Sequence, residues 1–331
     1  MARLLLKRSL AMIAVLLFLA AAVFTLQQLT PVNLAHSYLG GNASEAAIRA
    51  ETIKLGYNRP IVVQYVRYVG DVARGNFQMS LRTRRPVATD LRQYLPATLE
   101  LAFFGLLLAA VLGGLLGLVT AAKFRGAGLF RFVMLVGAST PPFLLALFGI
   151  LELYGHLHWL PATGRTSLAQ PPTGPTGLLT IDTLLHGQLH GFTDSIGHLI
   201  LPALCISILP AVSIGRVFRS SLVSTLRTDY IRTARSKGLS EIAVLWRHAI
   251  RNSVGAALSM GGLQVGLMFA GVVVIESIFA WPGIGLYTVE SIPRADFPAI
   301  AGVTLVLGAG YVIVNTLVDL LQAVADPRIA L

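Results

Sequence analysis

The sequence predicts an all-α integral membrane protein, and three observations support this fold class. Hydrophobic residues make up 55% of the 331 residues and charged residues only 12%. Soluble domains carry roughly 25% charged residues, and a single hydrophobic core stops growing at about 250–300 residues. The mean hydropathy is +0.72, and the apolar residues gather in long continuous runs. Lipid must therefore solvate part of the surface, which excludes a soluble enzyme, a disordered chain and a fibrous repeat.

Six apolar runs are long enough to cross a membrane as helices. A helix needs about 20 mostly apolar residues to cross a hydrocarbon core about 30 Å thick. The runs do not alternate between apolar and polar residues, which excludes the strands of a transmembrane barrel. The fourth run is the shortest, and we expect Pro202 and Pro210 to break it. The six predicted spans are residues 10–26 (extendable to 29), 101–122, 132–151, 199–215, 252–275 and 297–318.

The basic residues set the predicted orientation. A net charge of +11 in a soluble protein would suggest nucleic acid as a partner, but the 26 Lys and Arg lie almost entirely between the apolar runs. Outside the long first loop, 15 fall on one side of the membrane and two, Arg165 and Arg294, on the other. Cytoplasmic loops carry such an excess, so we expect both termini in the cytoplasm and no nucleic acid. The 15 are Arg3, Lys7, Arg8, Lys123, Arg125, Arg131, Arg216, Arg219, Arg227, Arg232, Arg235, Lys237, Arg247, Arg251 and Arg328.

This topology divides the chain into four parts. Residues 1–29 form the cytoplasmic N-terminus and the first span, and residues 30–96 an extracytoplasmic loop region. Residues 97–323 form a five-helix core, and residues 324–331 a cytoplasmic tail. The N-terminus has the basic start of a secretory signal, but its apolar run is longer than the 7–15 residues of a signal, so we expect it to be retained.

The first loop predicts a helix that begins at Asn58 as its cap, has Pro60 in its first turn and leaves at Gly75. Such a helix either lies on the membrane or the bundle, or contacts an external partner. In the extracytoplasmic loop between the third and fourth spans, His186 and His190 are four residues apart, so on a helix their rings would share a face, as a metal site needs. No Cys or carboxylate cluster completes that site, and we expect surface histidines.

Motifs of enzyme chemistry are absent from the sequence. None of the four lysines is followed by Ser or Thr, as a P-loop requires, and there is no HExxH, GxSxG or CxxC. Carboxylates in the apolar runs (Glu100, Glu152, Glu276 and Asp319) lie near predicted helix ends, where we expect structural roles. A secondary transporter would more typically carry a carboxylate at the midplane.

The most informative segment, "LRTDYIRTARSKGLSEIAVLWRHAIRNS", spans residues 226–253 between the fourth and fifth spans. It predicts two short helices around Gly238, the second capped by Ser240 with Glu241 in its first turn. An i, i+3, i+4, i+7, i+8 pattern predicts one apolar stripe on the second helix. Such a helix could lie on lipid headgroups or bind a soluble partner, and periodicity leaves both open. The stripe comprises Ile242, Leu245, Trp246, Ala249 and Ile250, with Arg247, His248 and Arg251 opposite.

This segment resembles the cytoplasmic "EAA" loop of binding-protein-dependent ABC importer permeases, in the dipeptide/oligopeptide/nickel subfamily, of the first-permease type. Gly238 takes the place of the loop's glycine and Ala234 that of its second alanine, whereas Arg232 and Thr233 replace Glu-Ala. These departures agree with the peptide-permease version of the loop. Further motifs follow the subfamily's order: "RPIVVQYVRYVGDVARGNF", "LPATLELA", "STPPF", "GHLILPAL", "VVVIESIFAWPGIG", "RADFPAI" and "ADPRI". The early "PGDPA" motif appears here as "PVNLA", residues 31–35.

The resemblance implies a type I ABC importer permease fold and a multi-pass, non-catalytic subunit of the bacterial plasma (inner) membrane. The implied partners are a second, homologous permease, two ATPase subunits or domains and an extracytoplasmic solute-binding protein. ATP and Mg would belong to the ATPases, so no cofactor is expected in this chain. The implied solute is a di- or oligopeptide. Nickel or a glutathione-type peptide is the alternative solute within the same family. Outside the family, a secondary transporter or channel and a membrane-embedded enzyme are the alternative classes of protein.

The resemblance also implies that a loop at about residues 219–251 couples the permease to an ATPase groove. Its movement would tilt the helices and open the central cavity to each side in turn. The residues that line the translocation path are left open. The expected coupling residues are Tyr230, Thr233, Ala234, Gly238, Leu239, Ser240, Leu245, Trp246, Arg247, His248 and Ile250.

Overall fold

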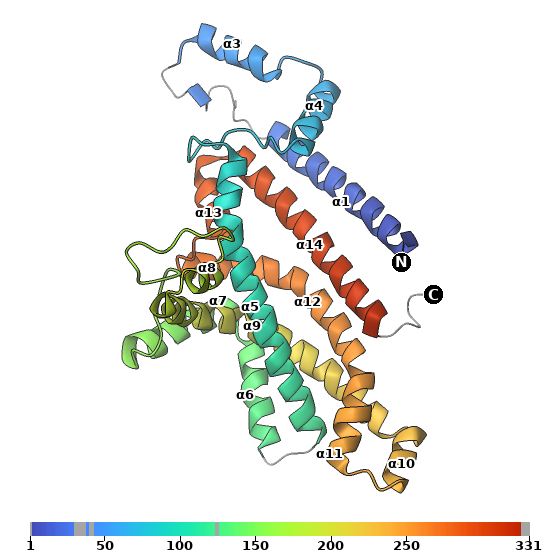
Figure 1. Cartoon of the computed structure of the whole chain (residues 1–331). Helices are drawn as coiled ribbons and strands as arrows, with labels where there is room; N and C mark the ends of the chain where they lie inside the picture. Colours follow the sequence, from blue (N-terminus) through green and yellow to red (C-terminus); the bar gives the residue numbers. More distant parts are fainter. Residues whose placement is uncertain (1, 30–37, 40–42, 123–125, 326–331) are drawn as a thin grey trace. The chain divides into compact units, whose positions relative to one another are not determined.

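The computed structural model describes residues 2–29, 38–39, 43–122 and 126–325, and these residues form helices without a named strand (Figure 1). The motif at residues 31–35, Lys123, Arg125 and the end of the predicted tail with Arg328 lie outside the described residues. The helices are α1 (Ala2–Leu29), α3 (Glu45–Leu55), α4 (Ile61–Ala73), α5 (Val87–Ala121), α6 (Ala127–Ser139), α7 (Pro142–Gly149), η1 (Ile150–His156), α8 (Leu179–Leu185), α9 (Leu189–Leu226), α10 (Asp229–Ser236), α11 (Glu241–Val244), η2 (Leu245–Ala249), α12 (Ile250–Ile278), α13 (Ile284–Ser291), η3 (Ile292–Arg294) and α14 (Phe297–Ala325).

The chain divides into two compact units. The first unit comprises Met1–Leu95 with Tyr287–Val312, and the second comprises Pro96–Leu286 with Ile313–Leu331. Helices α5 and α14 therefore contribute residues to both units.

Five helices in the described part are long and apolar enough to cross a membrane, and a bent helix pair makes a sixth if it counts as one span. This confirms the prediction of an all-helical membrane protein. The five are Ser9–Leu29, Val87–Ala121, Leu189–Leu226, Glu241–Ile278 and Phe297–Val318.

The third predicted span, residues 132–151, is not one straight helix in the structure. The chain turns by 110° between α6 and the following pair α7 and η1. Thr140 has an extended backbone (φ −89°, ψ 132°), as expected for a residue that precedes a proline. Pro141 and Pro142 follow it and cannot donate backbone hydrogen bonds to α6. The "STPPF" motif therefore ends one helix and starts the next.

The prediction that two prolines break the fourth span is wrong. Helix α9 runs for 38 residues through Pro202 and Pro210. In its most apolar window 67% of the residues are buried inside the protein, more than in any other span of the described part. Neighbouring helices compensate for lost backbone bonds in such helices, so burial sustains α9 where its sequence alone predicts an interruption.

Glycines allow the helices of the second unit to pack closely. A Cβ atom on Gly113 of α5 would lie 2.7 Å from the carbonyl oxygen of Ala211 in α9. In return, a Cβ on Gly215 of α9 would lie 2.9 Å from the carbonyl oxygen of Gly113. Small residues let helix backbones touch in this way. Helix α12 packs along α9 as well.

Two of the carboxylates in the apolar runs are buried and structural, as expected. Glu276 at the end of α12 accepts hydrogen bonds from the Thr98 hydroxyl at 2.5 Å and from the backbone N–H groups of Gly285 at 2.7 Å and Leu286 at 3.0 Å. Glu100 accepts from the backbone N–H and hydroxyl of Thr180 at 2.8 and 2.7 Å. Arg165 pairs with the same carboxylate. Glu276 therefore joins α12 to α5 and to the start of α13, and Glu100 joins α5 to the start of α8.

In the first unit, α4 packs on α1. The ring of Phe24 in α1 lies 5.5 Å from that of Tyr65 and 5.8 Å from that of Tyr68, both in α4. The Tyr65 hydroxyl donates to the carbonyl oxygen of Leu17 at 3.1 Å. Gly75 follows the end of this helix with φ +78°, as predicted. Pro60, not Asn58, is the residue that precedes its first turn, and no side chain caps it.

The histidine pair does not share a helix. His186 ends α8, and His190 lies in the first turn of α9. Both side chains are exposed. Among the residues that the structure describes, no three His, Cys, Asp or Glu side chains are grouped as a metal ion would need.

Candidate functional site

The segment between α9 and α12 forms two short helices around a tight turn at one end of the second unit (Figure 1). Helix α10 and helix α11 flank Gly238, as the sequence predicts. The second helix is not separate, because α11 continues through η2 directly into α12. Residues Glu241–Ile278 thus form one continuous helical run that begins in this segment and is long and apolar enough to cross a membrane. We call residues 226–251 the coupling segment, after the role that the family resemblance leads us to expect of it.

Gly238 ends α10 in a left-handed conformation, with φ +79°. Its N–H donates to the carbonyl oxygen of Arg235 at 2.9 Å, and the N–H of Leu239 donates to that of Ala234 at 3.3 Å. These two bonds form a Schellman motif, which satisfies the last carbonyls of a helix. A Cβ atom on Gly238 would meet no atom within 4 Å. Glycine is therefore favoured at this position by backbone conformation and not by space.

Two side chains fix the turn from outside. The Ser240 hydroxyl oxygen accepts the N–H of Ala243 at 3.3 Å, which confirms its predicted role as the cap of α11. The guanidinium of Arg235 donates from Nε and Nη2 to the two carboxylate oxygens of Glu241, at 2.8 and 3.0 Å. This two-point contact joins α10 to α11 across the turn. Helical periodicity gives no signal for it, because the six-residue spacing crosses a bend.

A small apolar core stabilises the segment from within. Ile231 and Ala234 of α10 and Val244 of α11 are buried against one another. Leu226 and Leu239 are half-buried and pack on this cluster. At the base of the segment, the Ser253 hydroxyl of α12 donates to the Thr225 hydroxyl of α9 at 3.2 Å. The turn is thus held by packing and by hydrogen bonds, and it connects two long helices.

The prediction that five apolar residues form one stripe is wrong, because the structure buries some of them and exposes others. Ala249 is buried and Leu245 and Ile250 pack on the Phe218 and Leu222 cluster of α9, whereas the other two stripe residues face outward. Ile242 is 72% exposed and Trp246 is 62% exposed. The cause is η2, a π-helical turn at Leu245–Ala249, whose i→i+5 bonding changes the register that α-helical periodicity assumes.

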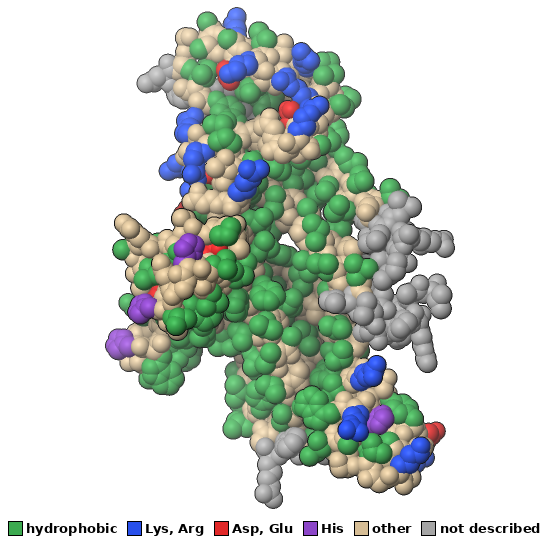
Figure 2. Space-filling model, in the orientation of Figure 1, with side chains coloured by type: hydrophobic (Ala, Val, Ile, Leu, Met, Phe, Trp, Pro, Cys, Tyr) green, Lys and Arg blue, Asp and Glu red, His purple; other side chains and the backbone are tan. Residues whose placement is uncertain are grey.

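The structure therefore presents an exposed apolar pair on the coupling segment. Ile242 and Trp246 are four residues apart and share a helix face. Tyr230 of α10 is also 45% exposed. Figure 2 shows basic and histidine side chains among the hydrophobic ones at this end of the second unit. The predicted coupling residues divide by exposure into one buried (Ala234), four half-buried (Leu239, Leu245, His248 and Ile250) and six exposed (Tyr230, Thr233, Gly238, Ser240, Trp246 and Arg247).

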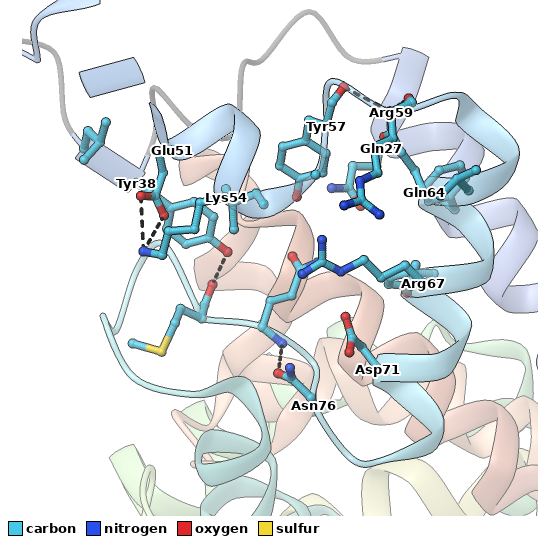
Figure 3. A pocket seen from close by; sticks show the side chains of 18 residues that line it. Gln27, Tyr38, Glu51, Lys54, Tyr57, Arg59, Gln64, Arg67, Asp71 and Asn76 are labelled. Atoms are coloured by element: carbon cyan, nitrogen blue, oxygen red, sulfur yellow. Dashed lines mark hydrogen bonds and ion pairs between the residues drawn. The ribbon is translucent and has the colours of Figure 1, made fainter. Parts of the chain in front are cut away.

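The first unit holds a cavity of about 630 Å³ that the sequence does not predict. Residues of α1, α3 and α4 line it, and Figure 3 shows charged and aromatic side chains turned toward it, among them Lys54, Tyr57 and Arg67. Lys54 pairs with Glu51 at 3.1 Å. Burial raises the pKa of Tyr68 in its wall to about 12, so this hydroxyl stays neutral at physiological pH.

Comparisons with known proteins cover the chain from end to end. Residues 105–331 match the family described as "Binding-protein-dependent transport system inner membrane component", and residues 1–102 match the family of its N-terminal part. The chain is 40% identical over 325 residues to the dipeptide transport system permease protein DppB of Alkalihalophilus pseudofirmus, covering 98% of each chain. It is 41% identical to the probable D,D-dipeptide transport system permease protein DdpB of Escherichia coli, over 92% of this chain and 91% of the relative. It is 39% identical to the di/tripeptide transport system permease protein DppB of Pseudomonas aeruginosa, over 92% of each.

Proposed function

Because the chain belongs to the family of binding-protein-dependent transport system inner membrane components, we propose that it forms half of the translocation path of an ATP-driven peptide importer. As a permease component it is a non-catalytic subunit, and it resides in the inner membrane. The names of its relatives support di- or oligopeptides as the solute. Nickel and glutathione-type peptides are the alternatives, and binding measurements on the purified extracytoplasmic receptor distinguish the three.

The coupling segment is the proposed contact with an ATPase subunit. The observation that carries this proposal is the exposed pair Ile242 and Trp246 on a segment whose backbone is fixed by the Gly238 turn. An aromatic side chain buries roughly 150–250 Å² when covered, and apolar burial contributes about 25 cal/mol per Å². Because Trp246 is 62% exposed, only that fraction of its area remains to be buried in a partner's groove, which would contribute about 2–4 kcal/mol to binding. Residues 226–251 carry six Lys and Arg but only two Asp and Glu, so the groove should be acidic at its rim.

The continuity of the helices supports a mechanical role. A displacement of α11 would pass through η2 into α12 without a flexible break. Helix α9 would follow, because it packs along α12 and its C-terminal end joins the same segment. ATP-driven movement of the partner would in this way tilt both long helices and open the path to each side in turn.

The remaining partners and the orientation belong to the same proposal. The excess of basic residues between the spans supports cytoplasmic termini and a cytoplasmic coupling segment. A second permease would complete the path, two ATPase subunits would bind ATP and Mg, and an extracytoplasmic protein would deliver the solute. No cofactor is assigned to this chain.

Charge substitution of the exposed pair tests the proposal. Ile242→Asp and Trp246→Asp should each release the ATPase subunits during co-purification, because a carboxylate would be buried at the interface. Thr173→Asp is the control, since it adds the same charge to an exposed position outside the coupling segment without removing apolar surface. Membrane insertion should be normal in all three variants. Full retention of the ATPases with normal transport in the two test variants would contradict the proposal.

A further inference from the structure

A cleft of about 320 Å³ in the second unit has three arginines in its wall. Arg216 and Arg219 lie three residues apart on α9 and therefore on one face of that helix, and Arg131 comes from α6. Leu116 and Thr120 lie in the last two turns of α5 and Arg131 in the second turn of α6, and Figure 1 shows the end of α5 and the start of α6 at the same end of the unit as α10 and α11. The remaining lining residues are Leu116, Thr120, Leu135, Val212 and Gly215.

These three guanidinium groups have no acidic partner among the described residues. The sequence contains no Asp or Glu between Glu100 and Glu152, nor between Asp194 and Asp229. All of the lining residues come from these two stretches. Within the part of the chain that the structure describes, none of the three arginines forms an ion pair. Like charges that converge in one cleft repel each other, so an anion from outside the chain would stabilise them.

The rest of the cleft lining is largely apolar, and α6 carries further exposed apolar side chains. Leu116, Leu135 and Val212 line it beside the arginines. On α6, the helix that carries Arg131, Phe132 and Val136 are exposed. The only side-chain hydroxyl of the lining, that of Thr120, already donates to the Leu116 carbonyl oxygen at 2.5 Å, so the guanidiniums alone can donate to a ligand. A basic end and an apolar wall match the two parts of a phospholipid.

We propose that this cleft binds the headgroup phosphate of an anionic phospholipid, with Arg131, Arg216 and Arg219 on the phosphate and an acyl chain along α6. Guanidinium groups bind phosphate oxygens through paired hydrogen bonds. Basic pockets between transmembrane helices bind acidic headgroups in the same way. The site does not depend on the proposed peptide transport, and it would stay occupied if the solute were different.

Lipid retention measured by native mass spectrometry tests the site on the full chain, with phosphatidylglycerol and phosphatidylcholine as probes. Each cation near an acidic membrane contributes about 1 kcal/mol, or roughly a factor of five. The triple variant Arg131→Gln, Arg216→Gln, Arg219→Gln should therefore bind phosphatidylglycerol about 100-fold more weakly, with phosphatidylcholine unchanged. The control removes three equal charges outside the cleft and should retain the lipid: Arg227→Gln, Arg232→Gln and Arg251→Gln.

Further variants and measurements in the same experiment distinguish a lipid from other occupants of the cleft. Replacing the same three arginines by lysine keeps the charge but loses the paired hydrogen bonds, so the affinity for phosphatidylglycerol should fall between those of the wild type and the Gln triple variant. If the Gln triple variant does not fold, this intermediate affinity tests the site, and an affinity equal to that of the wild type would contradict it. Displacement of bound phosphatidylglycerol by excess inorganic phosphate would assign the cleft to a free anion. If the Gln triple variant lost the second permease during purification but still retained phosphatidylglycerol as the wild type does, the cleft would be assigned to a protein interface. Either result, or equal loss in the control triple, overturns the proposal.

Discussion

Replacing Gly238 by residues that differ in their cost of a left-handed backbone should weaken ATPase binding in a graded order. The glycine has φ +79° and open space around its Cα, so a substituted side chain pays no steric cost against neighbours. The left-handed conformation costs an ordinary L-residue about 1–2 kcal/mol, costs Asn less, and costs β-branched residues more. We therefore expect the ATPase affinity to fall in the order Gly, Asn, Ala, Val.

The magnitude follows from the equilibrium between the ordered and disordered turn. A cost of about 1–2 kcal/mol lowers the ratio of ordered to disordered segment by roughly 5- to 30-fold. Titrating the purified permease variants with the ATPase subunits measures the affinity, and expression in the membrane fraction serves as the control, because the spans are untouched. An Asn variant that binds as weakly as the Val variant would show that the backbone conformation at Gly238 does not limit ATPase binding.

Two further substitutions probe the second unit. Glu276→Ala should lower the free energy of unfolding in detergent by about 2 kcal/mol or more, because it leaves two buried donors and one half-buried donor without an acceptor; Glu276→Gln should cost less, and equal losses would contradict this expectation. Gly113→Ala should destabilise by about 1–3 kcal/mol, because its Cβ would press on a backbone carbonyl of α9. Gly114→Ala is its matched control: this glycine has open space around it, so alanine should be neutral or stabilising by up to about 1 kcal/mol. Equal melting temperatures for these two glycine variants would refute the close packing of α5 on α9.

Local rules predict the turn of the coupling segment from the sequence. A glycine between two short amphipathic stretches and a serine before Glu241 are typical of a helix end followed by a helix start. Gly238 and Ser240 have those roles in the structure. Such features depend on neighbouring residues only, and this is why they can be read without knowledge of the fold.

Features that depend on distant residues or on helix type escape that reading. The π-helical turn η2 divides a predicted apolar stripe, so the sequence does not show that Trp246 faces outward while Ala249 is buried. The contact between Thr98 and Glu276 joins residues 178 positions apart. The long α9 persists through two prolines because other helices surround it, and burial of that kind is a property of the fold.

Photo-crosslinking from position 246 tests whether the coupling segment contacts an ATPase subunit. A benzoylphenylalanine in place of Trp246 should crosslink to an ATPase subunit in the assembled transporter, since the account places this exposed ring in the partner's groove. The same group in place of Leu263, which is also 62% exposed but lies on the apolar part of α12, should not reach the ATPase. Crosslinks from position 246 to lipid alone would contradict the account and would make the coupling segment a membrane-surface element.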